Sequence, residues 1–371
     1  MRVIQVTDYG SPHAGSFVPM LRTTLAGVRA SGWRAEVLLP PRAKTRDWLP
    51  AFTAEYGDAV RFAPDEGRSG ARKWLAEVVD AESGPTILHA HWSVYDLAVA
   101  ELARRPDVKA IWHFHTVLSE DLRARVRNRL RFTLASRYIE RMLCVSPHLV
   151  EAVCARGAPR AKVEYFPNGV DVDRFPGPVG PDERAAARAA LGLDPDATVL
   201  LHIGRDWELK GGDLFLDALS ELDGATGLLV RGGDRALAEA RQRGLEDRVR
   251  VLEGTSEVRR LHAASDLMLA TSRGEGMPFA VLEALSSGLG VVATDIPGHA
   301  LPGGGPEALR IVPLQAPAIA GETRALLGRP PGQALADGER SHAWVSAELG
   351  LPAWGERLIG LYREIAAGLS S

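Results

Sequence analysis

Two carboxylates, Glu275 and Glu283, stand in the segment RGEGMPFAVLEALSSG at residues 273–288. Pro278 is favoured at the first position of a helix and Gly288 just beyond a helix end, so the segment predicts a helix. Glu275 then lies in the loop that enters this helix, and Glu283 lies inside it. Because helical side chains lean toward the N-terminus, Glu283 is expected to point back at the helix mouth. Two such acceptors can bind the hydroxyl groups of a sugar.

The mouth of this predicted helix also carries free backbone donors. The N–H groups of Gly276, Met277 and Phe279 have no partner inside the helix, and Pro278 supplies no donor. A helix N-terminus with such donors favours an anion. The segment therefore predicts a receptor for a sugar attached to a phosphate. The structural alternative is a capped amphipathic helix with two exposed acids.

The segment closely resembles the Glu-x7-Glu signature of the family 4 glycosyltransferases, retaining enzymes with the two-domain GT-B fold. The resemblance covers nearly the whole chain. It implies that Glu275 contacts the transferred sugar and that Glu283 holds the ribose hydroxyls of the donor nucleotide. Met277-Pro278 stands where the family more often has Phe-Gly, which implies a mild change in the sugar pocket.

A pair of cations follows the first predicted strand of the second half, in the segment HIGRDWELKGGD. Gly204 permits a close turn, and Arg205 and Lys210 come after it. An enzyme that breaks a sugar–diphosphate bond without a metal needs fixed cations where the leaving diphosphate gains charge. Arginine can bind two phosphate oxygens at once and lysine adds a point charge. The positions resemble the family's diphosphate-binding element, which implies this role for Arg205 and Lys210; the alternative is two surface cations.

Four histidines end two neighbouring predicted strands of the first half: His89, His91, His113 and His115. Paired histidines suggest zinc, but the flanking carboxylate and cysteine ligands of a zinc site are missing, so no metal is expected. The resemblance implies that His115 approaches the donor sugar or orients the acceptor, and His91 is the weaker candidate.

A carboxylate pair, Asp171 and Asp173, looks like a metal-binding Asp-x-Asp. In the surrounding segment PNGVDVDRF, Asn-Gly favours a turn. This segment resembles the family's junction between domains, so the pair is not expected to bind a metal.

Glycine-containing loops match those that surround the nucleotide in the family. Gly15 and Ser16 stand in the first loop, where the family commonly has adjacent glycines that let backbone approach the donor phosphates. Gly232 and Gly254 follow two strands of the second half, in the loops that usually surround the base. Their contacts would be made mostly by backbone, so the sequence does not reveal which base is bound.

Short apolar runs alternate with helical patterns along the whole chain, which predicts an α/β protein with parallel sheets covered on both faces. The predicted strands are Val3–Val6, Ala35–Leu39, Val60–Phe62, Ile87–His89, Ala110–Phe114, Met142–Val145, Val163–Phe166, Val199–Ile203, Gly227–Val230, Val249–Leu252, Leu267–Ala270, Gly290–Ala293 and Leu309–Val312. These are too many for one such sheet. The prediction is therefore two doubly wound Rossmann-like domains facing across a cleft, and the resemblance to the family implies that this fold is GT-B.

The proline-rich and charged segment 173–196 predicts a linker with one short helix. The predicted acceptor-side domain spans residues 1–175 together with a C-terminal helix at about 354–371, and the predicted nucleotide-sugar domain spans 190–350. In the C-terminal helix the buried positions are expected to be Trp354, Leu358, Leu361 and Ile365.

The composition is that of an ordinary soluble protein, with 371 residues, 46% hydrophobic and 25% charged, and a net charge of −3 that argues against nucleic-acid binding. The only cysteines, Cys144 and Cys154, suggest a reducing compartment. Neither a secretory leader nor a membrane span is predicted, so we expect a cytoplasmic protein. The arginine-rich residues 122–142 could contact anionic lipid or an acidic acceptor, but the arginines are not confined to one helical face, so a solvated helix is predicted.

These features together predict a retaining, metal-independent glycosyltransferase without a cofactor. It would move a hexose-type sugar from a UDP- or GDP-sugar to a hydroxyl of a sugar, lipid-linked or small-molecule acceptor, in the synthesis of cell-surface glycans or glycosylated metabolites. Two alternatives stay open. A sugar-nucleotide epimerase of similar fold would change the donor sugar without an acceptor, and a non-catalytic protein would bind the nucleotide sugar without transferring it.

Overall fold

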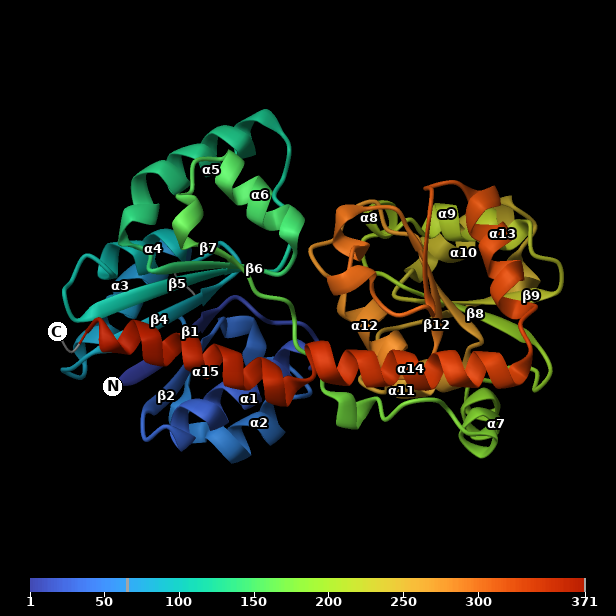
Figure 1. The fold of residues 1–371 in the computed structure, drawn as a ribbon, viewed down its shortest axis with the longest axis horizontal. Helices are drawn as coiled ribbons and strands as arrows, with labels where there is room; N and C mark the ends of the chain where they lie inside the picture. Colours follow the sequence, from blue (N-terminus) through green and yellow to red (C-terminus); the bar gives the residue numbers. More distant parts are fainter. Residues whose placement is uncertain (65–66, 370–371) are drawn as a thin grey trace. The chain divides into compact units, whose positions relative to one another are not determined.

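The computed structural model describes residues 1–64 and 67–369, and the chain divides into two compact units. Unit 1 comprises Met1–Gly169 and Leu351–Ser371, and unit 2 comprises Val170–Gly350. The sequence placed the corresponding boundaries at residues 175, 190 and about 354. Each unit is a parallel sheet surrounded by helices (Figure 1).

Unit 1 contains a seven-stranded sheet with the order β3-β2-β1-β4-β5-β6-β7, in which all neighbouring strands are parallel. Its strands are β1 Arg2–Thr7, β2 Arg34–Leu39, β3 Val60–Phe62, β4 Thr86–His91, β5 Val108–Phe114, β6 Arg141–Cys144 and β7 Val163–Tyr165. Its helices are α1 Phe17–Ala30, α2 Leu49–Tyr56, α3 Gly67–Asp80, α4 Asp96–Leu102, α5 Leu122–Ala135, α6 Pro147–Ala155 and α15 Leu351–Ala367.

Unit 2 contains a six-stranded sheet with the order β10-β9-β8-β11-β12-β13, again parallel throughout its recorded pairs. Its strands are β8 Thr198–Ile203, β9 Ala225–Val230, β10 Val249–Leu252, β11 Leu267–Ala270, β12 Gly290–Thr294 and β13 Leu309–Val312. Its helices are α7 Pro181–Ala190, α8 Trp207–Lys210, α9 Gly212–Ser220, α10 Gly233–Gln242, α11 Val258–Ala264, α12 Phe279–Ser286, α13 Ala316–Leu327 and α14 Pro331–Leu349.

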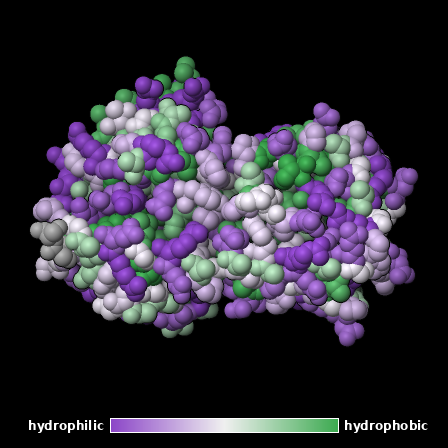
Figure 2. All heavy atoms as spheres, viewed as in Figure 1, coloured by the Kyte–Doolittle hydropathy of each residue, from purple (hydrophilic) through white to green (hydrophobic). Residues whose placement is uncertain are grey.

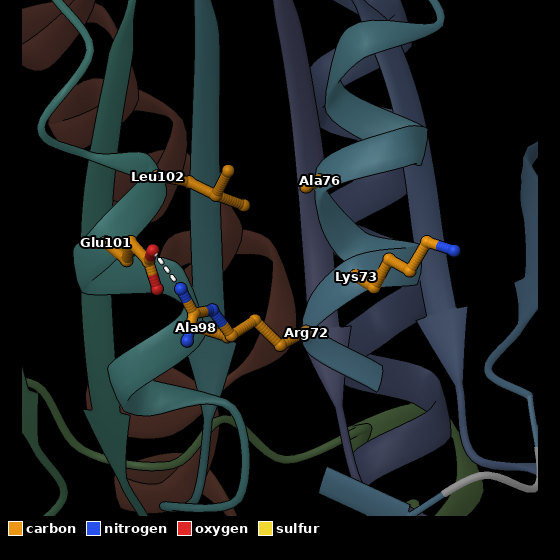
Figure 3. A pocket seen from close by; sticks show the side chains of 6 residues that line it. All are labelled: Arg72, Lys73, Ala76, Ala98, Glu101 and Leu102. Carbon is orange, nitrogen blue, oxygen red and sulfur yellow. Dashed lines mark hydrogen bonds and ion pairs between the residues drawn. The ribbon is translucent and has the colours of Figure 1, made fainter. Parts of the chain in front are cut away.

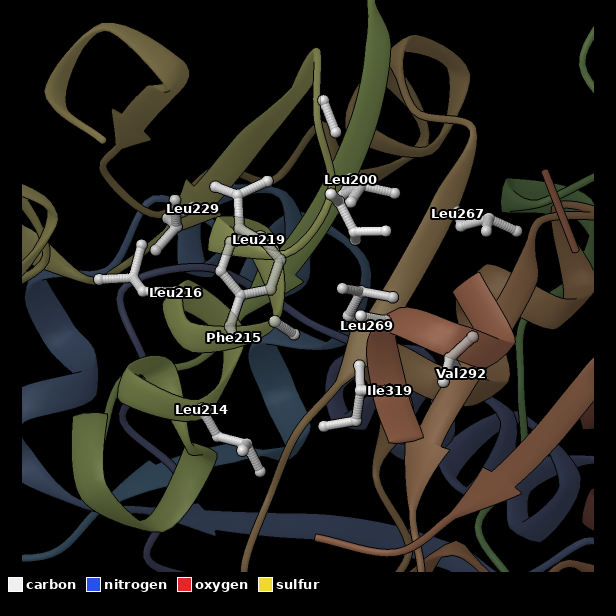
Figure 4. Close-up of a cluster of buried hydrophobic side chains, with 14 of the residues drawn as sticks. Leu200, Leu214, Phe215, Leu216, Leu219, Leu229, Leu267, Leu269, Val292 and Ile319 are labelled. Atoms are coloured by element: carbon white, nitrogen blue, oxygen red, sulfur yellow. The ribbon is translucent and has the colours of Figure 1, made fainter. Parts of the chain in front are cut away.

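The central strands of unit 1 are buried along their whole length because helices cover both faces of the parallel sheet. All six residues of β1 are buried, as are all six of β4. In unit 2 the leucines of β8, β9 and β11 meet Phe215 and Leu219 of α9 in one continuous core (Figure 4). This burial explains why the strands appear in the sequence as unbroken apolar runs.

Every strand that the sequence predicted is present among the described residues, with differences of at most two residues at either end. The predicted fold class is confirmed in its two doubly wound, Rossmann-like sheets. The short helix predicted within 173–196 is α7. The predicted buried stripe of the C-terminal helix is also confirmed, since Trp354, Leu358, Leu361 and Ile365 are buried in α15, which packs against α1.

Helix α12 begins one residue later than predicted. Pro278 has an extended ψ of 118° and is the residue before the helix, which starts at Phe279. The predicted end is confirmed: Ser286 is the last helical residue and Gly288 has a positive φ of 71°, a backbone conformation that glycine adopts without strain.

Candidate active site

The strand order of unit 2 brings two loops together at the carboxyl ends of its central strands. β8 pairs with β11 at the centre of the sheet. The chain continues from β8 to β9 on one side of this pair, and from β11 to β12 on the other side. In open parallel sheets this switch in strand order is where ligands bind. Gly204 and Arg205 lie in the loop after β8, which leads to Lys210 at the end of the short helix α8, and Glu275 lies in the loop after β11.

The two loops meet in an ion pair between Lys210 and Glu275. Ser272 donates a hydrogen bond from its Oγ to the same carboxylate oxygen, Oε1, at 2.8 Å. The side chain of Glu275 is 12% exposed and that of Lys210 is 27% exposed, so the pair is mostly shielded but reachable from solvent. Lys210 and Glu275, predicted separately as a diphosphate contact and a sugar contact, therefore lie side by side.

Contacts made by Thr271 and Arg273 hold the two loops together. Thr271 donates from Oγ1 to the carbonyl oxygen of Gly211 at 2.8 Å. Gly211 has a φ of 66°, and a Cβ there would lie 2.0 Å from the carbonyl oxygen of Thr271, so only glycine fits. Arg273 forms a bidentate ion pair with Asp213 of α9 at 2.8 and 2.7 Å, and it lowers the pKa of that carboxyl. The loops are held in place before any ligand binds.

Two glycines leave room for the ion pair. A Cβ at Gly204 would lie 2.5 Å from Cβ of Lys210, and a Cβ at Gly298 would lie 2.3 Å from the carbonyl oxygen of Glu275. Sequence reasoning identified Gly204 but missed Gly298, which lies in the loop after β12. An isolated Pro-Gly in a loop is an ordinary turn signal, so nothing in the sequence connected Gly298 with Glu275.

Two buried histidines lie near the ion pair and were also missed. Nδ1 of His299 donates to the carbonyl oxygen of Thr294 at 2.8 Å, and its Nε2 has no hydrogen-bond partner among the described residues. Burial lowers the pKa of His299, and the charges of Glu275 and Lys210 act on it in opposite directions. Burial also lowers the pKa of His202, at the end of β8, to about 4. Both rings are neutral at pH 7.

The remaining predicted residues of the Glu-x7-Glu segment lie on and before α12. Gly276 and Met277 are buried in the loop, and Glu283 is inside the helix and only 6% exposed. A buried glutamate at this position is not the exposed acid of the structural alternative. That Glu283 binds ribose hydroxyls stays a prediction.

Arg205, Gly232 and Gly254 lie in three separate loops of unit 2. Arg205 is exposed, and among the described residues its side chain forms no hydrogen bond or ion pair. Gly232 is the residue before α10, where a Cβ would lie 2.6 Å from that of Ala236. A Cβ at Gly254 would lie 2.6 Å from Nε of Arg231. Arg205 is thus free to turn toward an anion, whereas the two glycines permit close packing.

The first loop of unit 1 is held by Tyr9, whose hydroxyl donates to the carbonyl oxygen of Ala14 at 2.7 Å. Gly15 follows with a φ of 54°, a conformation that suits glycine, and Ser16 is the buried residue before α1. The ring of Tyr9 stacks on Trp92, with centroids 5.9 Å apart. The loop is therefore ordered at the carboxyl end of β1, where the family places backbone near the donor phosphates.

His115 belongs to a buried hydrogen-bond network on the face of the unit 1 sheet beneath α15. Its members are His115, His91, Gln5, Tyr362, His89 and His113, joined by contacts of 3.0, 2.9, 2.9, 2.6 and 3.3 Å in that order. Each group can donate to the next when every ring is neutral. Nδ1 of His115 lies 3.3 Å from the Asn168 side chain.

Burial lowers the pKa of every histidine in this network, that of His115 to about 4. Ring nitrogens of His89, His91 and His113 lie within 4.8 Å of one another, close enough to hold a metal ion. The hydrogen bonds to Tyr362, to Gln5 and between the rings already account for this arrangement. Absence of a metal stays a prediction, as does the role of His115 toward a donor sugar.

Two surface pockets lie away from these residues. One lies in unit 1 between α3 and α4, where Arg72 forms an ion pair with Glu101 (Figure 3). The other, in unit 2, is lined by Leu267 and Gly290, the first residues of β11 and β12. That pocket is therefore at the amino ends of the strands, opposite the ion pair. None of the predicted site residues lines either pocket.

Comparisons with known proteins identify the family of the chain and its fold. Residues 21–174 match a family model described as Glycosyltransferase Family 4, and residues 197–329 match one described as Glycosyl transferases group 1. The D-inositol 3-phosphate glycosyltransferase of Mycobacterium sp. (strain KMS) is 34% identical over 159 residues, which is 40% of this chain and 35% of that protein. The protein of that name from Xylanimonas cellulosilytica is 32% identical over 254 residues, 60% of this chain and 58% of its own. The chain thus spans about a third of the length of the mycobacterial relative.

Among solved structures, Anabaena HepE in complex with UDP and glucose has a TM-score of 0.79 at 18% identity, covering 98% of this chain and all of that one. Sucrose-phosphate synthase from Thermosynechococcus elongatus has a TM-score of 0.76 at 20% identity, covering 99% of each chain. The fold is therefore that of the two-domain GT-B proteins. With a family model matching each of its units, the chain belongs to the family 4 and group 1 glycosyltransferases.

Proposed function

We propose that this protein transfers a hexose-type sugar from a nucleoside-diphosphate sugar to an acceptor hydroxyl. The observation that carries the proposal is the ion pair between Lys210 and Glu275 at the switch point of unit 2. The pair places an ammonium group and a carboxylate side by side. A sugar linked to a diphosphate needs both: a cation for the phosphates and a hydrogen-bond acceptor for the sugar hydroxyls. UDP is the first nucleotide to test, because the HepE structure contains UDP and glucose.

The proposed reaction needs no metal and retains the anomeric configuration. The bond between the sugar C1 and the diphosphate oxygen breaks, and the acceptor oxygen bonds to C1 from the same face. The acceptor proton passes to the departing diphosphate. Lys210 and Arg205 stabilise the negative charge that the diphosphate gains. Removing one such contact should lower the rate about 10²–10³-fold. Glu275 holds a hydroxyl of the transferred sugar, and Glu283 holds the ribose.

A transfer assay tests the proposal. The protein is incubated with each nucleotide sugar, with and without EDTA, and with an inositol phosphate as the first acceptor, because relatives carry that substrate in their name. A glycosylated acceptor and a released nucleoside diphosphate are expected, and the product anomer is read by NMR. An altered donor sugar without any acceptor would indicate the epimerase instead. Donor binding without any product would indicate the non-catalytic protein.

We further propose a cytoplasmic location and a role in making cell-surface glycans or glycosylated metabolites. Among the described helices, none combines the length and the apolar character needed to cross a bilayer. Fractionation of cells that produce the tagged protein tests the location, and recovery outside the cytoplasm and the inner membrane surface would contradict it.

A further inference from the structure

Helix α5 exposes a line of large apolar side chains to solvent. Leu122 is 77% exposed, Val126 53%, Leu130 56% and Leu134 59%. Ten large hydrophobic side chains are exposed among the described residues, and four of them are these. Because they are spaced by four, they form one ridge along a helix of 14 residues, about 21 Å long. Single exposed leucines need no explanation, but an aligned row does.

The opposite side of α5 is already buried in unit 1. Ala124, Asn128 and Phe132, again spaced by four, are buried against the rest of the unit. Arg131 anchors this side through an ion pair of 2.9 Å with the buried Asp96 at the start of α4. The apolar ridge is therefore not the core face of the helix, because that face has its own residues. It points away from the unit.

Arginines line both flanks of the ridge. Arg123 and Arg127 form one row, and Arg125 and Arg129 form the other; all four are exposed. Among the described residues their side chains make no hydrogen bond or ion pair, whereas most arginines of unit 1 do. No acid lies between Leu122 and Ala135. Figure 2 shows apolar residues among hydrophilic ones along the edge where Figure 1 draws α5.

We infer that α5 is a membrane-docking surface that lies on an anionic lipid bilayer. An interfacial helix inserts an apolar row among the acyl chains while arginines reach up to the phosphates, since their stems are apolar and their ends are charged. A second copy of the chain is a poorer partner, because two α5 helices face to face would bring eight arginines together with no acid inside either helix. This inference does not depend on the proposed transfer reaction.

The inference thus differs from the sequence-based prediction for this segment. The arginines surround the helix, which suggested a solvated element. The burial pattern shows that they occupy two flanks, between a buried row and an exposed apolar row. An exposed face that is both apolar and basic suits an anionic surface better than water.

Vesicle binding by the full chain tests the inference. The native protein is sedimented with vesicles of phosphatidylcholine alone and of phosphatidylcholine with phosphatidylglycerol, at low and high salt. The ridge variant is Val126→Ser/Leu130→Ser and the charge variant is Arg125→Gln/Arg129→Gln. The control, Leu335→Ser/Arg241→Gln, removes an exposed leucine and an exposed arginine from unit 2. Circular dichroism and thermal unfolding confirm that each variant folds.

The inference predicts binding to anionic vesicles that salt weakens, a loss of at least about tenfold in both α5 variants, and no loss in the control. It is overturned if the native chain binds no vesicles, if it binds neutral vesicles equally well, or if the ridge variant binds as tightly as the native chain. A dimer seen by light scattering that the ridge variant abolishes, without vesicle binding, would also overturn it and assign the ridge to a second copy.

Discussion

Lys210 and Glu275, 65 residues apart in the sequence, form an ion pair at the carboxyl ends of β8 and β11. Without a ligand, the carboxylate neutralises the cation. A diphosphate that binds at Lys210 must therefore share or replace this contact.

Glu275→Gln is predicted to separate binding from catalysis. Removing the carboxylate frees Lys210 and relieves repulsion of the diphosphate, so the affinity for the nucleoside diphosphate should rise about tenfold. Transfer should fall by about 100-fold or more, because a neutral amide accepts a hydrogen bond from the sugar hydroxyl more weakly than the charged carboxylate does. Calorimetry and initial rates measure the two effects. Glu307→Gln, which removes an exposed glutamate of unit 2, should change neither, and unchanged transfer in Glu275→Gln would refute the assigned role.

Gly298→Ala should disturb the site without touching a charged group. Its Cβ would meet the carbonyl oxygen of Glu275 at 2.3 Å, so the loop must shift. We expect transfer to fall at least about tenfold and the free energy of unfolding to fall by about 1–3 kcal/mol. In Gly321→Ala, inside α13, the new Cβ meets nothing within 4 Å, and a gain of about 0.5–1 kcal/mol is expected. Native activity in Gly298→Ala would show that the close contact is unimportant.

Tyr362→Phe should destabilise unit 1. The hydroxyl accepts from Gln5 at 2.9 Å and contacts Nδ1 of His89 at 2.6 Å. Its removal leaves two buried polar atoms without a partner, at a cost of about 1–3 kcal/mol each. Urea unfolding measures the loss. Tyr138→Phe is the control, because that hydroxyl forms no hydrogen bond among the described residues; equal stability of the two variants would contradict the network.

The buried histidines should make stability depend on pH. The folded protein keeps His89, His91, His113 and His115 neutral, whereas in the unfolded chain they titrate near their ordinary pKa of 6.5. Their pKa is lowered by folding, so they cost nothing above pH 6.5 and destabilise the protein as the pH falls below it. Each adds a slope of up to about 1.4 kcal/mol per pH unit.

Unfolding free energies measured from pH 8 to pH 4.5 check this prediction. His115→Asn should reduce the slope between pH 6.5 and about 4, the range set by the lowered pKa of that ring. His148→Asn removes an exposed histidine and should leave the slope unchanged. A stability that is flat from pH 6.5 to pH 4.5 would mean that the rings are charged in the folded state.

The strands could be predicted from sequence because burial on both faces leaves unbroken apolar runs. The Glu-x7-Glu segment was visible because its residues are neighbours along one loop and helix. The contact between Lys210 and Glu275 and the close approach of Gly298 to Glu275 depend on strand order, which a single sequence does not show. The same holds for Nε2 of His299, which has no hydrogen-bond partner in the part of the chain that the structure describes. Tyr362 follows Leu361, one of the predicted buried positions of the C-terminal helix. Nothing in the sequence indicated that its hydroxyl joins the hydrogen-bond network of the histidines.

The apolar ridge of α5 was not visible in the sequence for a similar reason. Its apolar residues occupy two opposite rows, one buried and one exposed. On a helical projection two opposite apolar rows cancel, so the segment looks merely basic. Only the burial of Ala124, Asn128 and Phe132 shows which row belongs to the core.

The most direct test of the account measures thermal unfolding with UDP-, GDP-, ADP- and dTDP-sugars in the presence of EDTA, for the native chain, Lys210→Ala and Lys73→Ala, whose lysine is exposed. A donor at about a hundred times its dissociation constant adds roughly 2.7 kcal/mol of stability. We predict stabilisation by one nucleotide class, kept in EDTA and in Lys73→Ala and lost in Lys210→Ala. Stabilisation by none of the four, or equal stabilisation of Lys210→Ala, would contradict the nucleotide-sugar site.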